Sequence, residues 1–198
     1  MDCKTINATL LDISEHKCYN LLAKIKKRRK IMTKVQIEMQ DGKIINLDLY
    51  EDVAPITVEN FLSYVDEGFY DGLCFHRVID GFMIQGGGFE WKDGLVQKQG
   101  KAPIKGEFKI NGVENEISHM PGVISMARTM FKDSATSQFF ICVDDASFLD
   151  GQYAGFGKVS DEESLSNAIE IGKVDTGNWQ YYGDVPTTPV VIKTIRRI

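Results

Sequence analysis

The chain of 198 residues is long enough for one globular domain with an appendage. Its hydrophobic fraction of 43%, charged fraction of 26% and net charge of −5 are ordinary for a globular domain, and no apolar run approaches the roughly 18 residues of a membrane span. These values argue against a membrane partner, and the missing apolar core of a secretory signal predicts a cytoplasmic location.

The net charge combines two segments of opposite sign. Residues 1–31 carry eight Lys/Arg and three Asp/Glu, whereas residues 32–198 carry fifteen Lys/Arg and twenty-five Asp/Glu. Nucleic-acid binding needs clustered positive charge that neutralises phosphates. We therefore expect no nucleic-acid partner for residues 32–198.

Residues 1–31 form a basic extension that ends in the run KIKKRRK at 24–30. The extension shows no convincing folding pattern, and three explanations remain open. It is a mis-assigned start read ahead of a natural initiation at Met32, a translated disordered tail, or a nucleic-acid arm. Purine-only codons for Arg28-Arg29 would resemble a ribosome-binding sequence, which favours the first. No aromatic residue interleaves the basic run for base stacking, which disfavours the third.

A β-hairpin is predicted directly after Met32. Apolar and polar residues alternate on both sides of Asp41-Gly42, where glycine accepts the positive φ that a tight turn needs. The inward residues would be Val35, Ile37 and Met39 on the first strand and Ile45, Leu47 and Leu49 on the second.

The next segment, PITVENFLSYVDEG, predicts a helix. Its apolar residues Val58, Phe61, Leu62 and Val65 follow the i, i+3, i+4, i+7 spacing of one helix face. We expect Thr57 to cap its start and Gly68 to end it.

The remaining chain predicts short strands and one more helix. The strand patterns are CFHRVI, FMIQGG, VISMAR, SQFFICV, AGFGKV and the terminal VVIKTIRRI. The second helix is expected at about 161–171, with Leu165, Ala168 and Ile169 inward, and residues 90–120 are expected to form a long surface loop. Many short strands with two helices favour an antiparallel barrel or sandwich.

Cysteine and histidine spacing gives no metal pattern. Cys3, Cys18, Cys74 and Cys142 form no C-x-x-C pair, so free buried thiols are the preferred interpretation for the two in apolar runs. The three histidines lie far apart, and no G-x-S-x-G elbow is present, although residue types alone leave a Ser-His-Asp triad open.

Polar residues inside apolar strands are the most informative feature. FHRVIDGFMIQGGG places Arg77 and Gln85 among large apolar residues, and GVISMART and SATSQFFI add further polar side chains. In strict alternation Arg77 shares a face with Phe75 and Ile79, so its guanidinium would lie against an apolar floor.

These segments resemble the cyclophilin family of peptidyl-prolyl cis-trans isomerases. FHRVIDGFMIQGG is nearly unaltered from the family pattern, and SQFFI, FLDGQYAGFGKV and the terminal strand follow in the expected order over about residues 33 to 198. QGGGFE, ISMART and TGNWQYYGDVP look most like the small bacterial cytosolic members. The resemblance implies an all-β fold, a closed eight-stranded antiparallel β-barrel capped by two α-helices, over residues 32–198.

The resemblance also implies the site residues. Arg77 and Gln85 would be catalytic, without cofactor or metal. The expected substrate-binding residues are Phe82, Met83, Ala127, Arg128, Gln138, Phe140, Phe148, Leu149 and Tyr153.

Three positions depart from the eukaryotic pattern. Phe148 stands where many members have Trp, Tyr153 where many have His, and Arg128 where others have an Asn. The missing indole N–H at Phe148 predicts weak cyclosporin binding.

The implied reaction is rotation about X–Pro peptide bonds in unfolded or flexible protein clients, which assists protein folding. Rotation makes and breaks no covalent bond, so the lack of a recognisable nucleophile or metal motif is consistent with it. A peptide-binding module or holdase that uses the same groove with little turnover is the alternative. We expect a monomer.

Overall fold

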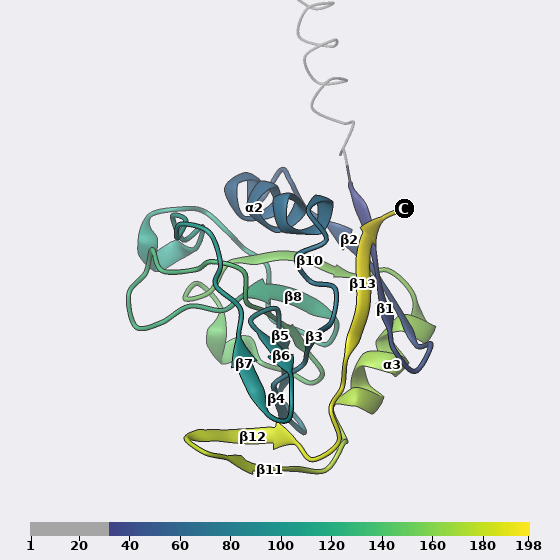
Figure 1. Cartoon of the computed structure of the whole chain (residues 1–198). Coiled ribbons are helices and arrows are strands. Elements are labelled where there is room, and N and C mark those ends of the chain that lie inside the picture. The colour runs from purple at the N-terminus through teal and green to yellow at the C-terminus, as the bar shows by residue number, and fades with distance from the viewer. Residues whose placement is uncertain (1–31) are drawn as a thin grey trace, which may run out of the picture. The chain divides into compact units, whose positions relative to one another are not determined.

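The computed structural model describes Met32–Ile198. The expectations about residues 1–31, and about Cys3 and Cys18 within them, lie outside the described residues. Figure 1 shows the described part as a curled sheet with helix α2 near one end and helix α3 on another side.

Eight strands form one antiparallel sheet in the order β13-β1-β2-β10-β8-β9-β5-β4. Their bounds are β1 (Lys34–Met39), β2 (Ile44–Leu49), β4 (Arg77–Ile79), β5 (Met83–Gly86), β8 (Val123–Met126), β9 (Phe139–Cys142), β10 (Gly155–Val159) and β13 (Ile192–Arg197). The predicted mostly-β class with an eight-stranded antiparallel sheet and two helices is confirmed.

The sheet curls without a strand pairing between its edges, β13 and β4. The segment before β4 makes the connection instead: Phe75 N–H donates to Val190 O, just before β13, at 2.9 Å, and Gly72 N–H donates to Ile192 O, at the start of β13, at 2.9 Å. The predicted barrel is thus cyclophilin-like in strand order but not closed by a continuous ladder. The short edge strand β4 also contacts β12 (Tyr182–Pro186).

The first hairpin matches its prediction. β1 pairs with β2 in antiparallel register, and Gly42 in the turn has φ +92°. The predicted inward residues of both strands are all buried, because side chains alternate between the two faces of a strand.

Helix α2 (Pro55–Asp66) buries the predicted apolar face, and Gly68 has φ +62° just after its end. Its start differs from the prediction, because the N-cap position is Ala54 and Thr57 lies within the first turn. The Glu107 carboxylate accepts from Thr57 N–H at 2.7 Å and from Ile56 N–H at 3.2 Å. An acidic side chain from a distant segment therefore accepts the first backbone N–H groups of the helix, which a neighbouring N-cap residue usually does.

Helix α3 (Glu162–Ile171) begins where predicted. Asp161 caps it by accepting from Ser164 N–H at 2.7 Å. Ala168 is buried, and Leu165 and Ile169 pack against the core from partly buried positions.

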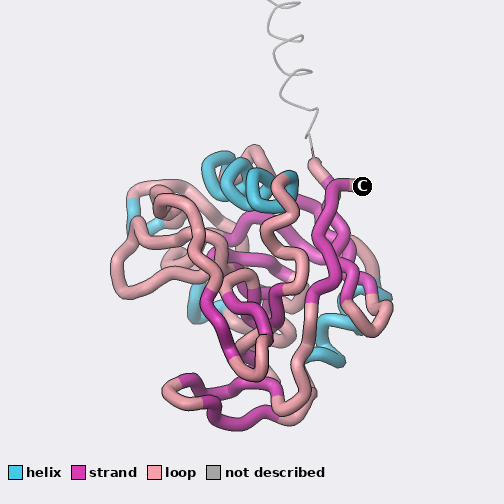
Figure 2. Tube along the Cα trace, viewed as in Figure 1, coloured by secondary structure: helices cyan, strands magenta, loops and turns pink. Residues whose placement is uncertain are grey.

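Two further hairpin regions were not predicted. β3 (Leu73–Cys74), β6 (Phe89–Trp91) and β7 (Leu95–Gln97) form a small sheet, and β11 (Thr176–Trp179) pairs with β12. The rest of residues 98–120 is mostly loop, drawn pink in Figure 2, with a 3₁₀ turn at Lys109–Asn111. A second 3₁₀ turn covers Ser147–Leu149.

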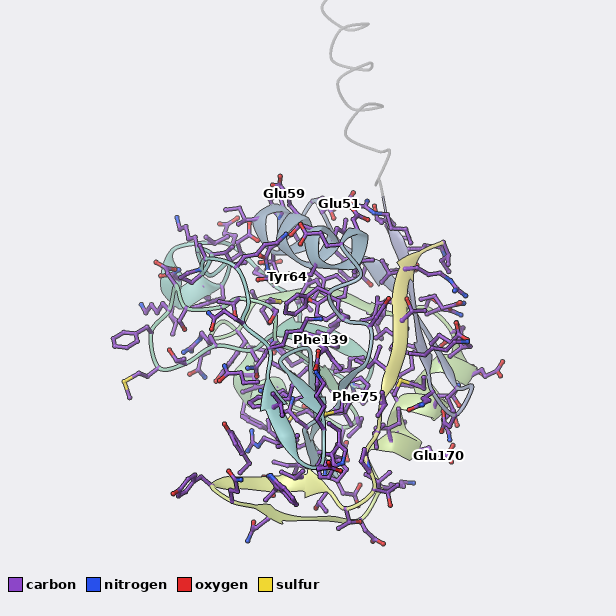
Figure 3. All side chains as sticks on the ribbon, viewed as in Figure 1. Glu51, Glu59, Tyr64, Phe75, Phe139 and Glu170 are labelled. Atoms are coloured by element: carbon purple, nitrogen blue, oxygen red, sulfur yellow. The ribbon has the colours of Figure 1, made fainter. Side chains whose placement is uncertain are left out.

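Aromatic side chains fill the interior of the curled sheet. Phe61 of α2 packs on Tyr70, Phe139 and Phe156 with ring centroids 5.3–5.5 Å apart. In Figure 3, Tyr64, Phe75 and Phe139 lie inside, whereas Glu51, Glu59 and Glu170 lie at the surface. Within Met32–Ile198 no helix has the length and apolar character needed to cross a bilayer.

Candidate active site on the outer face of the sheet

Strand register brings three predicted site residues into one row. Arg77 on β4 is directly opposite Gln85 on β5, and Gln85 is directly opposite Phe140 on β9. Directly opposed residues of antiparallel strands project to the same face. A cation, an amide and an aromatic ring thus lie side by side on one surface.

The opposite face of the same strands builds the interior. Val78, Ile84 and Ile141, which alternate with the residues of that row, are buried in the main hydrophobic core. The outer face carries a separate small cluster centred on Met83 and Phe140. The candidate site is therefore an outer surface whose shape is fixed by the packed core of the curled sheet behind it.

A shallow pocket of about 130 Å³ opens on this outer face. Nine of the eleven predicted site residues line it: Arg77, Phe82, Met83, Gln85, Ala127, Arg128, Phe140, Leu149 and Tyr153. Met83 and Phe140 are 2% and 5% exposed and form a fixed apolar floor. One water occupies roughly 30 Å³ in the liquid, so the pocket has room for a small apolar ring.

The other two predicted residues lie beside this pocket. Gln138 lines an adjacent groove together with Gln85, Ala127 and Arg128. Phe148 is 64% exposed, and its ring packs on Phe82 with centroids 5.3 Å apart. Both adjoin residues of the pocket without lining it.

The polar side of the pocket consists of Arg77 and Gln85. Gln85 Nε2 donates to Gln138 Oε1 at 3.0 Å, which fixes the orientation of the Gln85 amide. Arg77 Nε donates to Asp184 Oδ2 at 3.3 Å, and no other hydrogen bond joins its guanidinium to a described residue. Both terminal Nη groups of Arg77 are thus available to a substrate.

Arg128 is held differently. Its Nε and Nη2 donate to Gln152 O at 3.2 and 3.0 Å, and its guanidinium lies 4.5 Å from the Tyr153 ring centroid. These hydrogen bonds and the cation–π contact already engage much of the Arg128 guanidinium, so fewer of its donors are free for a substrate. Arg128 therefore forms part of the wall, and Arg77 is the less constrained cation.

A hydrogen-bonded network beneath the pocket was not predicted; its His119 and Ser125 are buried, whereas its Asp150 is partly exposed. His119 Nδ1 lies 2.8 Å from Asp150 Oδ1 and His119 Nε2 lies 3.0 Å from Ser125 Oγ, while the imidazole stacks on Phe140 at 6.1 Å. These are the residue types of a hydrolytic triad, but Ser125 is fully buried and cannot reach a substrate. Burial lowers the pKa of His119, so the neutral ring acts as a support for Phe140.

The described cysteines are not nucleophiles. Cys74 and Cys142 are buried and free, as predicted. Burial raises the pKa of Cys74 to about 11 and that of Cys142 to about 12, so both remain protonated thiols. Within Met32–Ile198 no group of three or more His, Cys, Asp or Glu residues is suited to hold a metal ion.

Comparison with known proteins identifies the family. The family model for cyclophilin-type peptidyl-prolyl cis-trans isomerases matches residues 34–197. Peptidyl-prolyl cis-trans isomerase A of Dickeya dadantii is 47% identical over 159 residues, 78% of this chain and 79% of that protein. Peptidyl-prolyl cis-trans isomerase B of Escherichia coli is 43% identical over 169 residues, 81% of this chain and 97% of that protein.

Solved structures show the same fold. A cyclophilin-type isomerase of Cryptosporidium parvum, determined in the presence of the dipeptide Ala-Pro, superposes with a TM-score of 0.65 at 26% identity. The match covers 83% of this chain and 98% of that one. The sequence match and the fold agree, and the chain belongs to the cyclophilin-type peptidyl-prolyl cis-trans isomerase family.

Proposed function

We propose that this isomerase acts on X–Pro bonds in unfolded or flexible protein segments, with Arg77 as the hydrogen-bond donor to the proline nitrogen. The observation that carries the proposal is the row Arg77–Gln85–Phe140 beside an apolar pocket. In this row Arg77 supplies a cation with unengaged N–H donors, Gln85 supplies an oriented amide, and Phe140 is part of an apolar floor large enough for a proline ring.

The chemistry needs a donor rather than a nucleophile. Amide resonance gives a rotation barrier of about 18–20 kcal/mol, and an unaided X–Pro bond isomerises over tens to hundreds of seconds. In the twisted state the proline nitrogen loses conjugation and regains a lone pair. A donor aimed at that nitrogen stabilises the twisted state more than either planar state, which accelerates rotation in both directions.

The remaining residues receive roles by position. Met83, Phe140 and Leu149, with Phe82 and Tyr153 around them, would hold the proline ring while the preceding carbonyl turns. Gln85, fixed by Gln138, would hold that carbonyl or its neighbouring backbone. Ala127 and Arg128 form the wall along which the peptide would lie.

Finer properties of the protein follow from the same proposal. The clients are proline-containing segments without fixed structure, because an exposed shallow pocket admits only a chain that can lie across it. Phe148 offers an aromatic surface without an indole N–H, so cyclosporin binds weakly. We also propose a monomer located in the cytoplasm, where the two buried thiols remain reduced.

The alternative function is a peptide-binding module that uses this groove with little turnover. Turnover of a short proline peptide separates the two. A protease-coupled assay on wild type and on Arg77→Ala should show catalysis that depends on Arg77. A wild-type protein that binds the peptide, as seen by NMR shift changes, but does not accelerate its isomerisation would establish the binding module instead.

A further inference from the structure

The hairpin formed by β11 and β12 lies against the edge strand of the site. β12 contacts β4, and Figure 1 shows the hairpin beside β4 at the end of the molecule away from α2. From β12 the Asp184 carboxylate accepts a hydrogen bond from Arg77 Nε at 3.3 Å. The two side chains are 46% and 44% exposed, so the contact lies at the rim of the pocket.

Asp184 is held where it can make this contact. Its backbone has φ +59°, in the left-handed region that Asp tolerates better than most residues. Two aromatic contacts fix the hairpin on either side: Tyr182 packs edge-on against Phe89 at 5.2 Å, and Trp179 packs on Trp91 at 5.3 Å. The carboxylate is thus presented by a braced segment rather than by a free loop.

We propose that Asp184 is a positioning residue that holds the Arg77 guanidinium in its working orientation. The inference rests on the proposed role of Arg77. A guanidinium is planar, so a partner on Nε restricts its rotation and leaves both Nη groups for the substrate. Without that partner, the Arg77 side chain would lose conformational entropy on binding the twisted X–Pro bond, which would raise the barrier. A donor that is already oriented in the free enzyme avoids this cost during the reaction.

The Asp184 carboxylate has two opposing effects on Arg77. Its negative charge screens the Arg77 cation, whereas its oxygen orients the guanidinium. Asp184→Asn removes the charge and keeps an acceptor oxygen, and Asp184→Ala removes both. If positioning dominates, Asn retains most of the activity. Ala then loses about fivefold in kcat with KM nearly unchanged, in line with an exposed ion pair worth up to about 1 kcal/mol.

The kinetic experiment measures kcat and KM on a short proline peptide for these variants, alone and in an Arg77→Ala background. Asp184→Ala should lower kcat in the wild-type background and have no further effect when Arg77 is absent. Asp175→Ala is the matched control, because Asp175 immediately precedes the hairpin and its removal causes the same charge loss without touching Arg77. An equal loss in both backgrounds would make Asp184 merely structural, and no loss in either would overturn the proposal.

A readout without turnover separates this inference from the proposed function. The Arg77 Nε–H resonance should be resolved and slow to exchange in the wild type, and broadened or fast-exchanging in Asp184→Ala. If the resonance is equally ordered in both proteins, Asp184 does not position Arg77, whatever the activity. If the ordering is lost as expected but the wild type shows no catalysis, the proposed role of Arg77 fails instead.

Discussion

At the scale of single residues, the proposed site relies on donors whose orientation is fixed before a substrate arrives. The strand register places Arg77 beside Gln85, and hydrogen bonds to Asp184 and Gln138 restrict the two side chains. No covalent step is needed for bond rotation, so in the proposed mechanism each residue contributes through the stabilisation that it gives the twisted amide.

Arg77→Ala should lower kcat/KM by roughly 10²–10³, the range for removing one preorganised donor. The fold should survive, because the Arg77 side chain is 44% exposed and packs into no core. The protease-coupled assay measures the loss, and circular dichroism checks the fold. Arg197→Ala, which removes another half-exposed Arg from the far end of β13, should leave activity unchanged. A fully active Arg77→Ala protein would show that Arg77 is a surface residue without a catalytic role.

His76, next to Arg77, should make stability depend on pH. Burial, together with the nearby Arg77 charge, lowers the pKa of His76 to about 4 from an ordinary value of 6.5. The folded state therefore binds fewer protons than the unfolded state between these values. The contribution of His76 to the free energy of unfolding is therefore fully present above pH 6.5. It falls by about 3 kcal/mol as the pH drops to 4.

Urea unfolding at pH 7.5, 6, 5 and 4 measures this dependence. His76→Gln should flatten it, whatever the change in absolute stability. Some slope should remain, because burial also lowers the pKa of His119. An unchanged slope in His76→Gln would assign the pH dependence to other groups.

At the scale of elements, the sequence predicted those turns and helix ends that are determined by neighbouring residues. The hairpin at Asp41-Gly42 and the start of α3 at Asp161 follow from a turn glycine and an adjacent cap. The start of α2 was misplaced because its backbone N–H groups are satisfied by Glu107, about fifty residues away. No pattern around Thr57 indicates so distant a partner.

The hairpins around Trp91 and Trp179 escaped prediction for a similar reason. These tryptophans belong to different segments, and their contact at 5.3 Å exists only in the folded chain. Gly94 shows how close the approach is, since a Cβ there would lie 2.3 Å from the Trp179 ring. Short strands stabilised by such tertiary contacts carry little alternation of their own.

Glu107→Ala should destabilise the protein by about 2–4 kcal/mol, because hydrogen bonds to a charged group are strong and buried donors would be left unsatisfied. Glu107 is 3% exposed and also accepts from Thr57 Oγ1 at 2.7 Å. Urea unfolding measures the loss. Glu107→Gln keeps one acceptor oxygen and should lose less.

The matched control for Glu107 is Glu59→Ala. Glu59 lies on the exposed side of α2 (Figure 3), and its removal should change stability by less than about 0.5 kcal/mol. Equal effects of the two substitutions would mean that Glu107 does not stabilise the helix start.

At the scale of the whole molecule, the position of the site follows from how the sheet divides its two faces. Alternation in FHRVIDGFMIQGG sends Val78 and Ile84 inward and Arg77 and Gln85 outward. The expected place of Phe75 on the Arg77 face was wrong, because Phe75 lies before β4 begins and is buried in the main core against Phe139. Which segments meet around the pocket depends on the curl of the sheet, and the family resemblance supplied that information. The contact of Asp184 with Arg77 was missed because it joins residues 107 positions apart through a hairpin that was itself unpredicted.

Removing residues 1–31 should leave stability and isomerase activity unchanged. Met32–Ile198 forms a compact unit by itself, contains all eight strands of the main sheet, and includes the whole segment matched by the family model. Urea midpoint and kcat/KM of the shortened and full chains provide the measurement, at both low and physiological salt because the removed segment is basic. A lower midpoint or a salt-dependent loss of activity would show that the basic extension contributes to the enzyme. Peptides from residues 1–23 in mass spectra of the native protein would show that the extension is translated, and the mis-assigned start would then be abandoned.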